Sequence, residues 1–427
     1  MEKKTKLILF LLLFFFLLRV GVVIIAGQKA SDFTGDDCVS YNGFATAILQ
    51  NSDWLINPDF IGDYRPPVYP VFIAIIYAIF GMNNFLAVYI FQAIISTLTC
   101  FYIYQFAKKI FNDKVALLSL IWSGLYISYL LYASMLLRET LIIFFVIVFF
   151  YYLYLFLTDE TKKTKNFYLT VIFYSLLIHT DPRYLFYLPF FIIFFIGYQQ
   201  AWQGIKRYSI FLVITLLLIV PWAIRNYIAY DGIVIINTRG IDLREKTGRN
   251  HKMAVYKSGV LNFGIINSTE NKGYPSEEER KLIKAGLNPN NRSEGELIAI
   301  RNDVYPASTY LGRKAYMAIE LWKPFDFTRS YRPFPDARYN RIWSIKHNLS
   351  SIISYGILLP FMILGIYALV KKKDRVWYFL TLPLVVHTLL HMLEHGRNRY
   401  RMPVDFFIII LGCYGMIMAY DLIRSRK

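Results

Sequence analysis

Long apolar runs constrain the fold of this chain more than any other feature of its sequence. Three of them, Leu7–Ile25, Leu141–Leu157 and Phe406–Tyr420, carry almost no charged side chains. A helix needs roughly 20 mostly apolar residues to cross the hydrocarbon core of a bilayer. The chain of 427 residues is 56% hydrophobic, and its mean hydropathy of +0.39 is too high for a soluble protein of this size. The sequence therefore predicts an all-α integral membrane protein with many spans.

Clusters of Lys and Arg predict how these spans are oriented. The clusters flank apolar segments at short loops or termini, where positive charge marks the cytoplasmic side; they lie at residues 3–6, 108–114, 162–165, 206–207, 371–375 and 424–427. If all of them are cytoplasmic, both termini lie inside and about ten spans follow, at 7–27, 85–107, 115–134, 140–157, 167–181, 184–201, 208–224, 349–370, 376–393 and 402–421. The plausible range is 10–12 spans, because residues 66–81 are apolar but short. Since two prolines open this segment, we interpret it as a juxtamembrane helix on the outer face.

The same topology divides the chain into three parts. Residues 1–224 form an N-terminal membrane region that includes a first outer loop at 28–84, residues 225–347 form one large outer loop, and residues 348–427 form the C-terminal spans. Within the large loop, Ser276 and Gly286 bound one predicted helix, and residues 310–322 are predicted to form another that lies on the membrane. The formal net charge of +18 fits cytoplasmic clusters that attract anionic lipid, and the spans exclude a nucleic-acid partner.

Ionisable residues gather on the predicted outer side. Asp36 and Asp37 follow the first span, and the other members are Arg65, Arg138, Glu139, His179, Asp181, Arg183, Arg225 and the segment 394–401. A membrane protein has little reason to keep carboxylates at the bilayer surface unless they do chemistry or bind a cation. The alternative is that each is an ordinary interfacial residue whose charge reaches water. The whole set favours a site on this face.

These residue types suit the transfer of a sugar from a lipid-linked phosphate to a hydroxyl. A hydroxyl is a poor nucleophile and needs a carboxylate as general base, whereas the leaving phosphate needs cations, best supplied by bidentate Arg. We favour Asp37 as the base because Tyr41 stands four residues later on the same helical face, and Asp36 would orient it or bind the acceptor. The phosphate would be held by arginines, namely Arg225, Arg397, Arg399 and Arg401.

The motifs that carry these residues resemble a known family. They are Gly35-Asp36-Asp37 with Tyr41, Arg65-Pro66-Pro67-Val68-Tyr69-Pro70, Arg138-Glu139-Thr140, Pro221-Trp222 with Arg225-Asn226, and Arg399-Tyr400-Arg401-Met402-Pro403. Together they are similar to motifs of the GT-C integral-membrane glycosyltransferases. The closest resemblance is to the dolichyl-phosphate-mannose protein mannosyltransferase-like group, glycosyltransferase family 39 and its bacterial relatives.

The resemblance implies a GT-C-type bundle with outer juxtamembrane helices and one large outer loop. It implies an inverting transfer from a polyprenyl-phosphate monosaccharide in the bilayer, with Asp37 as the base. The residues themselves suggest further roles: Arg65, Arg183 and Tyr41 would bind substrate or support the site, and His391 would contact the donor phosphate. Arg138 and Glu139 would bind substrate or form an internal ion pair. Eukaryotic members carry further luminal domains that this chain lacks, which favours a bacterial enzyme of the inner membrane. Its site would face the periplasm and modify a glycolipid, a polysaccharide or a protein.

Three alternatives stay open at this stage. His387, His391 and His395 recur at helical spacing and could hold a divalent metal, or they could be interfacial histidines; no cofactor is otherwise indicated. A lipid or solute transporter would place its charges near the middle of the membrane, often within inverted repeats. A polysaccharide polymerase or ligase shares the spans and arginines but gives no reason for the first-loop motifs.

Overall fold

The computed structural model describes residues 2–27, 37–51, 53–55, 65–230, 233–234, 264–265, 315, 317–319, 321–324, 349–393 and 398–425. Its first half contains α1 (Glu2–Ala26), α2 (Asp37–Gln50), α3 (Val68–Phe80), α4 (Phe85–Ile110), α5 (Asp113–Gly124), α6 (Ile127–Tyr132), α7 (Glu139–Thr158), α8 (Lys163–Ile178), η3 (Pro182–Tyr187), α9 (Leu188–Tyr198) and α10 (Ala201–Tyr230). Two short strands, β1 (Ile233–Val234) and β2 (Gly264–Ile265), pair antiparallel. The C-terminal part contains η4 (Ile352–Gly356), α15 (Leu358–Lys371), α16 (Val376–Leu393), α17 (Asn398–Arg401), η5 (Met402–Val404) and α18 (Asp405–Ser425).

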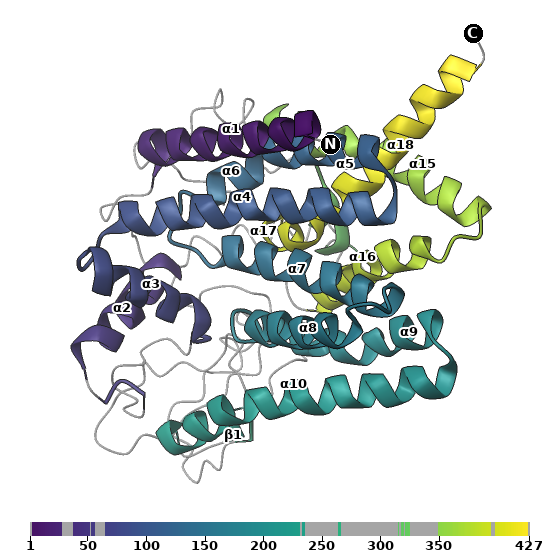
Figure 1. The fold of residues 1–427 in the computed structure, drawn as a ribbon. Coiled ribbons are helices and arrows are strands. Elements are labelled where there is room, and N and C mark those ends of the chain that lie inside the picture. Colours follow the sequence, from purple (N-terminus) through teal and green to yellow (C-terminus); the bar gives the residue numbers. More distant parts are fainter. Residues whose placement is uncertain are drawn as a thin grey trace, which may run out of the picture.

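The prediction of an all-α membrane protein is confirmed. Among the described residues, six helices are long and apolar enough to cross a membrane, at Lys3–Ala26, Phe85–Ile110, Glu139–Thr158, Ala201–Ile228, Leu349–Lys371 and Arg399–Ser425. The remaining predicted spans are shorter helices, which are α5 with α6, α8, α9 and α16. Figure 1 shows these helices running roughly alongside one another, with α1 at the top and α10 at the bottom.

Helix α7 lies at the centre of the bundle. In its most apolar stretch 78% of the residues are buried, against 17% in α1 and in α10. Aromatic side chains surround it: Phe150 packs against Phe379 of α16 and against Phe406 and Phe407 of α18. The large apolar side chains left exposed on α1 and α10 suit contact with lipid. Because α7 is packed on most of its surface, its neighbours hold its first residue, Glu139, in a fixed position.

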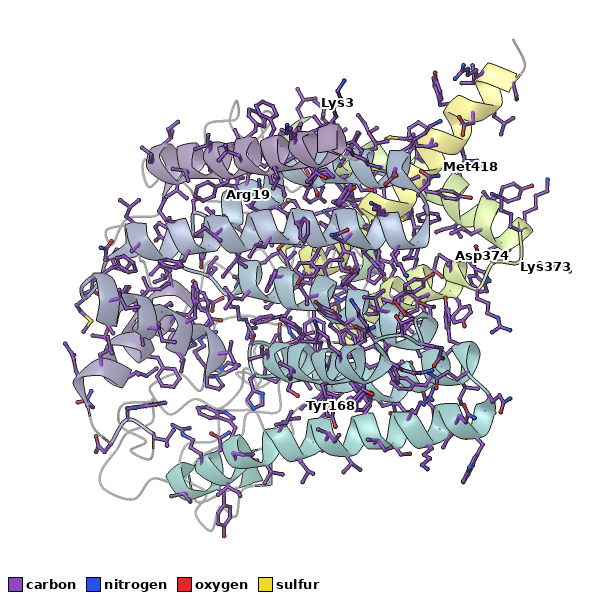
Figure 2. All side chains as sticks on the ribbon, viewed as in Figure 1. Lys3, Arg19, Tyr168, Lys373, Asp374 and Met418 are labelled. Atoms are coloured by element: carbon purple, nitrogen blue, oxygen red, sulfur yellow. The ribbon has the colours of Figure 1, made fainter. Side chains whose placement is uncertain are left out.

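The two ends of the bundle differ in the way that the charge pattern predicts. At one end Asp113 pairs with Lys4 and with Lys108, and Lys109 pairs with Asp159, all on exposed or partly exposed side chains. Figure 1 shows the N-terminus and the C-terminal end of α18 toward this end, and α2 with α3 at the opposite end. Three of the predicted cytoplasmic clusters, at 3–6, 108–114 and 371–375, belong to this first end (Figures 1 and 2).

Helix α3 occupies the apolar segment that follows the two prolines. Its 13 residues extend about 20 Å at the usual helical rise, which is short of the roughly 30 Å hydrocarbon core. It packs against α2 and α4 at the end of the bundle. This arrangement agrees with the juxtamembrane helix expected for residues 66–81.

The predicted span at 115–134 consists of two helices, because the chain breaks between α5 and α6. Arg19 of α1, fully buried, donates to the carbonyl oxygen of Gly124 at 3.2 Å and to that of Phe15 at 3.1 Å. Figure 2 shows Arg19 between α1 and α4. The guanidinium also bonds Ser96, so the cation satisfies carbonyls at the end of α5 that a continuing helix would have used.

Of the two helices predicted in the large loop, the one bounded by Ser276 and Gly286 lies outside the described residues. Residues 315, 317–319 and 321–322 are helical and belong to the second, predicted at 310–322.

Candidate active site

Asp37 begins α2 and lies between two arginines that come from distant parts of the chain. Arg65 Nη2 donates to Asp37 Oδ1 at 2.8 Å, and Arg399 Nη2 donates to Asp37 Oδ2 at 2.7 Å. The Asp37 side chain is 12% exposed, and those of the two arginines are 17% and 19% exposed. Both carboxylate oxygens are thus held by guanidinium groups at a position that solvent still reaches.

Tyr41 stands about one helical turn after Asp37 in α2. The guanidinium carbon of Arg65 sits 4.8 Å from the centre of the Tyr41 ring, and Tyr69 packs edge-on against the same ring. Arg65 therefore touches both residues of the Asp-x-x-x-Tyr pattern, which agrees with their expected common face on α2. Burial opposes the charge of Arg65, but the neighbouring Tyr41 and Asp37 raise its pKa above the ordinary value.

Glu139 brings a second carboxylate to Arg399. Arg399 Nε donates to Glu139 Oε1, and Glu139 is only 4% exposed at the first turn of α7. The segment that leads into this turn is held by Gln92 of α4, whose amide donates to the carbonyl oxygens of Ala133 and Met135 at 3.1 and 2.7 Å. Tyr69 donates to the same Gln92 side chain, so α3 and α4 together set the position of Glu139.

A second arginine–carboxylate group adjoins the first. Asp181 is 2% exposed. Its two carboxylate oxygens share the N–H of Arg183 Nε, one of them also accepts from Arg183 Nη2, and the same oxygen lies 3.4 Å from Arg138 Nη2. Arg138 also donates to the carbonyl oxygen of Thr180 at 2.9 Å. Burial alone would raise the pKa of Asp181, but Arg138 and Arg183 hold it well below the ordinary value. Asp181 also accepts a hydrogen bond from the Arg183 backbone and so caps η3.

Arg138 and Glu139 do not form the internal ion pair that was one interpretation of their adjacency, because each binds another partner. The two groups are nevertheless neighbours, since the charges of Arg138, Arg65, Asp37 and Glu139 all act on the phenol of Tyr41. The structure thus brings together Asp37, Tyr41, Arg65, Arg138, Glu139, Arg183 and Arg399. The sequence placed Asp181 among the ionisable residues of the outer side and not among the site residues, although the arginine two positions later was a signal that it could be an ion-pair partner.

Arg401 lies in a different environment. It is 2% exposed, and it donates to Asp405 Oδ1 at 2.8 Å and to the carbonyl oxygens of Leu321 and Lys323 at 3.1 and 3.2 Å. Its guanidinium carbon stacks 3.5 Å from the centre of the Tyr355 ring. These contacts favour a structural role, in which Arg401 anchors segment 321–324, over the predicted contact with a phosphate.

Arg225 is also held by groups outside the cluster around Asp37. It donates to the carbonyl oxygen of Leu55 at 2.5 Å and to Asn226 Oδ1 at 2.8 Å, and its guanidinium lies over the Trp222 ring. It joins the end of α10 to the segment after α2. Asp36, Arg397 and His395, which were also candidate residues, lie outside the described residues.

The histidines of α16 support the segment that carries Arg399. His387 is 1% exposed; its Nε2 lies 2.7 Å from the carbonyl oxygen of Tyr400, and its Nδ1 is bonded to the hydroxyl of Tyr187. His391 stacks on the Tyr400 ring, with the planes at 11°, and Arg183 lies over the same ring. Because both nitrogens of His387 are engaged, it does not fit a metal ligand, and the described residues contain no group of three side chains that could hold a metal ion.

Comparison with known proteins gives a family match for part of the chain. Residues 64–224 match the family model of the dolichyl-phosphate-mannose-protein mannosyltransferases. The resemblance to this family is thereby confirmed. The matched region includes Arg65, Arg138, Glu139, Asp181 and Arg183. Among curated proteins, none matches the chain significantly in sequence.

Two solved structures share the fold. The crystal structure of the Archaeoglobus fulgidus oligosaccharyltransferase in its apo form matches with a TM-score of 0.54 at 13% identity, over 98% of this chain and 51% of that one. The oligosaccharyltransferase AglB from the same organism, in complex with an inhibitory peptide and a dolichol-phosphate, matches with a TM-score of 0.56 at 10% identity, over 99% and 52%. This chain spans about half of the length of either protein, and at these identities the match shows a common fold of the GT-C type.

Proposed function

We propose that the protein is an inverting membrane glycosyltransferase that moves one monosaccharide from a polyprenyl-phosphate donor to an acceptor hydroxyl. The single observation that carries the proposal is the placement of Asp37 between Arg65 and Arg399 at one end of a GT-C-type bundle. A hydroxyl nucleophile requires a carboxylate as its general base, and a phosphate leaving group requires cations such as guanidinium groups to stabilise its charge. The family match and the dolichol-phosphate bound to AglB support a lipid-phosphate donor.

In the proposed reaction, Asp37 accepts the proton of the acceptor hydroxyl. The oxygen attacks the anomeric carbon from the side opposite the phosphate, and the new carbon–oxygen bond inverts that centre. The bond from the anomeric carbon to the phosphate oxygen breaks, and its electron pair leaves with the polyprenyl phosphate. Arg399 stabilises the charge that develops on the leaving group, and Asp36 orients the base or binds the acceptor.

The donor's tail would lie in the bilayer, so the site must open at the membrane surface. We propose that this surface is the periplasmic face of a bacterial inner membrane, because the site lies at the end of the bundle opposite the lysine clusters. The acceptor would be a glycolipid, a polysaccharide or a protein.

The test uses the full-length protein in nanodiscs with a panel of polyprenyl-phosphate monosaccharides and a membrane extract as acceptor. Free polyprenyl phosphate is followed by mass spectrometry for the wild type, for Asp37→Asn and for the control Asp113→Asn. Asp113 also pairs with two lysines, but at the opposite end of the bundle. We expect release by the wild type and the control, and a loss of roughly 100-fold or more for Asp37→Asn.

Equal release by Asp37→Asn and the wild type would exclude Asp37 as the base. A folded wild type that releases polyprenyl phosphate from none of the donors would overturn the proposed function, and it would favour a polymerase or a transporter.

A further inference from the structure

Arg399 is shared between two carboxylates that lie on different helices. Its Nη2 bonds Asp37 at the start of α2, and its Nε bonds Glu139 at the start of α7. Arg65 occupies the other oxygen of Asp37. Each oxygen of the proposed base therefore accepts from a guanidinium group in the free protein, which lowers its basicity, and withdrawing one of the two groups would make Asp37 a stronger base.

Arg399 is better suited to leave Asp37 than Arg65 is. Arg65 is fixed locally, because it also donates to Ser40 at 3.2 Å and lies over the Tyr41 ring, and both residues belong to the same helix as Asp37. Arg399 can remain paired with Glu139 when it leaves Asp37. A guanidinium that leaves one carboxylate for another keeps its charge paired throughout, which avoids the cost of leaving a buried charge alone.

Glu139 has an unused acceptor for this purpose. Its Oε2 atom is buried and has no hydrogen-bond partner among the described residues, whereas Oε1 is bonded to Arg399. A buried acceptor without a donor is costly, so its presence calls for an explanation. Carboxylates bind guanidinium groups most strongly through two parallel hydrogen bonds, and Glu139 can reach that state when Arg399 turns away from Asp37.

We propose that Glu139 is a positioning residue that holds Arg399 when the donor phosphate draws it off Asp37. This inference rests on the proposed function. In the free protein Arg399 masks the base; with donor bound, it lies between Glu139 and the phosphate, and Asp37 Oδ2 is open to the acceptor hydroxyl. Donor binding would thereby switch on the base, and the order of events would protect the donor from premature attack.

The proposal predicts a change in the pH dependence. The charged and titratable groups around Asp37 are Arg65 from the loop before α3, Tyr41 from α2, Arg399 from α17, and Arg138 and Glu139 at the start of α7. Replacing Glu139 by Gln removes one negative charge from this set and leaves Arg399 to Asp37 alone. Both changes favour the ionised form of Asp37, so the acid limb of kcat/KM should move to lower pH.

The experiment measures kcat, donor KM and the pH profile of kcat/KM for the wild type, Glu139→Gln and Glu139→Asp in nanodiscs. We expect Glu139→Gln to lower kcat at least roughly 10-fold, because Arg399 stays on Asp37, and to move the acid limb down by about half a pH unit. Glu139→Asp keeps the charge and should restore the wild-type pH profile and part of kcat, which also covers the case in which the Gln variant fails to fold.

The outcomes separate this inference from the function on which it rests. A Glu139→Gln variant with reduced kcat and an unchanged pH profile would show a merely structural role and overturn the proposal. Wild-type kinetics in that variant would overturn it as well, with the proposed function intact. A wild type that uses none of the donors would overturn both.

Discussion

Arg399 Nη2 lies 2.7 Å from Asp37 Oδ2, although the two residues are 362 positions apart in the chain. The contact joins the C-terminal segment α17 to the first helix after the first span. Glu139, at the start of the most buried helix, bonds the same guanidinium. The candidate site is therefore assembled only when the two ends of the chain have packed on α7. Substituting its arginines one at a time can distinguish the contacts that serve catalysis from those that serve stability.

Arg399→Lys and Arg401→Lys should have different effects, although the two residues share one motif. Lysine keeps the charge but cannot bridge Asp37 and Glu139, so Arg399→Lys should weaken the use of donor roughly 10-fold or more in kcat/KM. Arg401→Lys should lower the free energy of unfolding by about 2 kcal/mol, since its guanidinium bonds Asp405 and two carbonyl oxygens, with donor KM unchanged. Kinetics and thermal unfolding in one detergent check both. An equal rise in donor KM for the two variants would favour the sequence-based hypothesis that both bind the phosphate.

Asp181→Asn should destabilise the protein in a way that depends on pH. Burial disfavours the charged carboxylate, but Arg138 and Arg183 hold its pKa in the folded protein below the ordinary 3.8. A carboxyl whose pKa is lowered by folding stabilises the fold above its ordinary pKa, and this stabilisation is lost as the pH falls below that value. The variant should therefore unfold about 3 kcal/mol more easily at pH 7, because a buried pair is broken. The difference from the wild type should shrink below about pH 4. Thermal unfolding at several pH values tests this, and a constant difference would argue against the ionised form of Asp181.

Gly415→Ala should weaken the packing of α18 against α15. A Cβ at Gly415 would lie 1.9 Å from the carbonyl oxygen of Phe361, and one at Gly365 would lie 2.5 Å from that of Leu411, so backbone atoms would have to move. We expect a loss of roughly 2 kcal/mol in unfolding free energy. Gly21→Ala in α1 is the matched control: a Cβ there meets nothing within 4 Å, and alanine favours the helix. Equal melting temperatures for the two variants would mean that α15 and α18 pack less closely than the contacts at Gly365 and Gly415 indicate.

Tyr41→Phe should separate stability from activity. The hydroxyl of Tyr41 is buried and has no hydrogen-bond partner among the described residues, so its removal should leave the melting temperature unchanged or raise it slightly. If substrate supplies the partner, kcat/KM for the donor should fall severalfold. Paired measurements of melting and kinetics decide this, and a clear loss of stability would indicate a structural partner for the hydroxyl.

The apolar runs and the lysine clusters by themselves determined the class of fold. A bilayer admits few spanning structures, so about 20 apolar residues in a row predict a helix, and the clusters predict which ends lie together. The break between α5 and α6 was not predictable, because its cause is Arg19, a residue of another helix. Local hydropathy carries no information about such a contact.

The sequence indicated the residue types of the candidate site, and the structure shows which of these residues contact one another. Short motifs pointed to Asp37, Tyr41, Arg65, Glu139 and Arg399, because few roles at a membrane surface need carboxylates and arginines. Which guanidinium meets which carboxylate was decided by the packing of α2, α7 and α17, since ion pairs form across helices and not along the sequence. Arg399 and Arg401 stand two residues apart in the chain, yet one bonds Asp37 and the other bonds Asp405. Only the tertiary structure assigns those two environments, because the direction of each side chain depends on the helices packed around it.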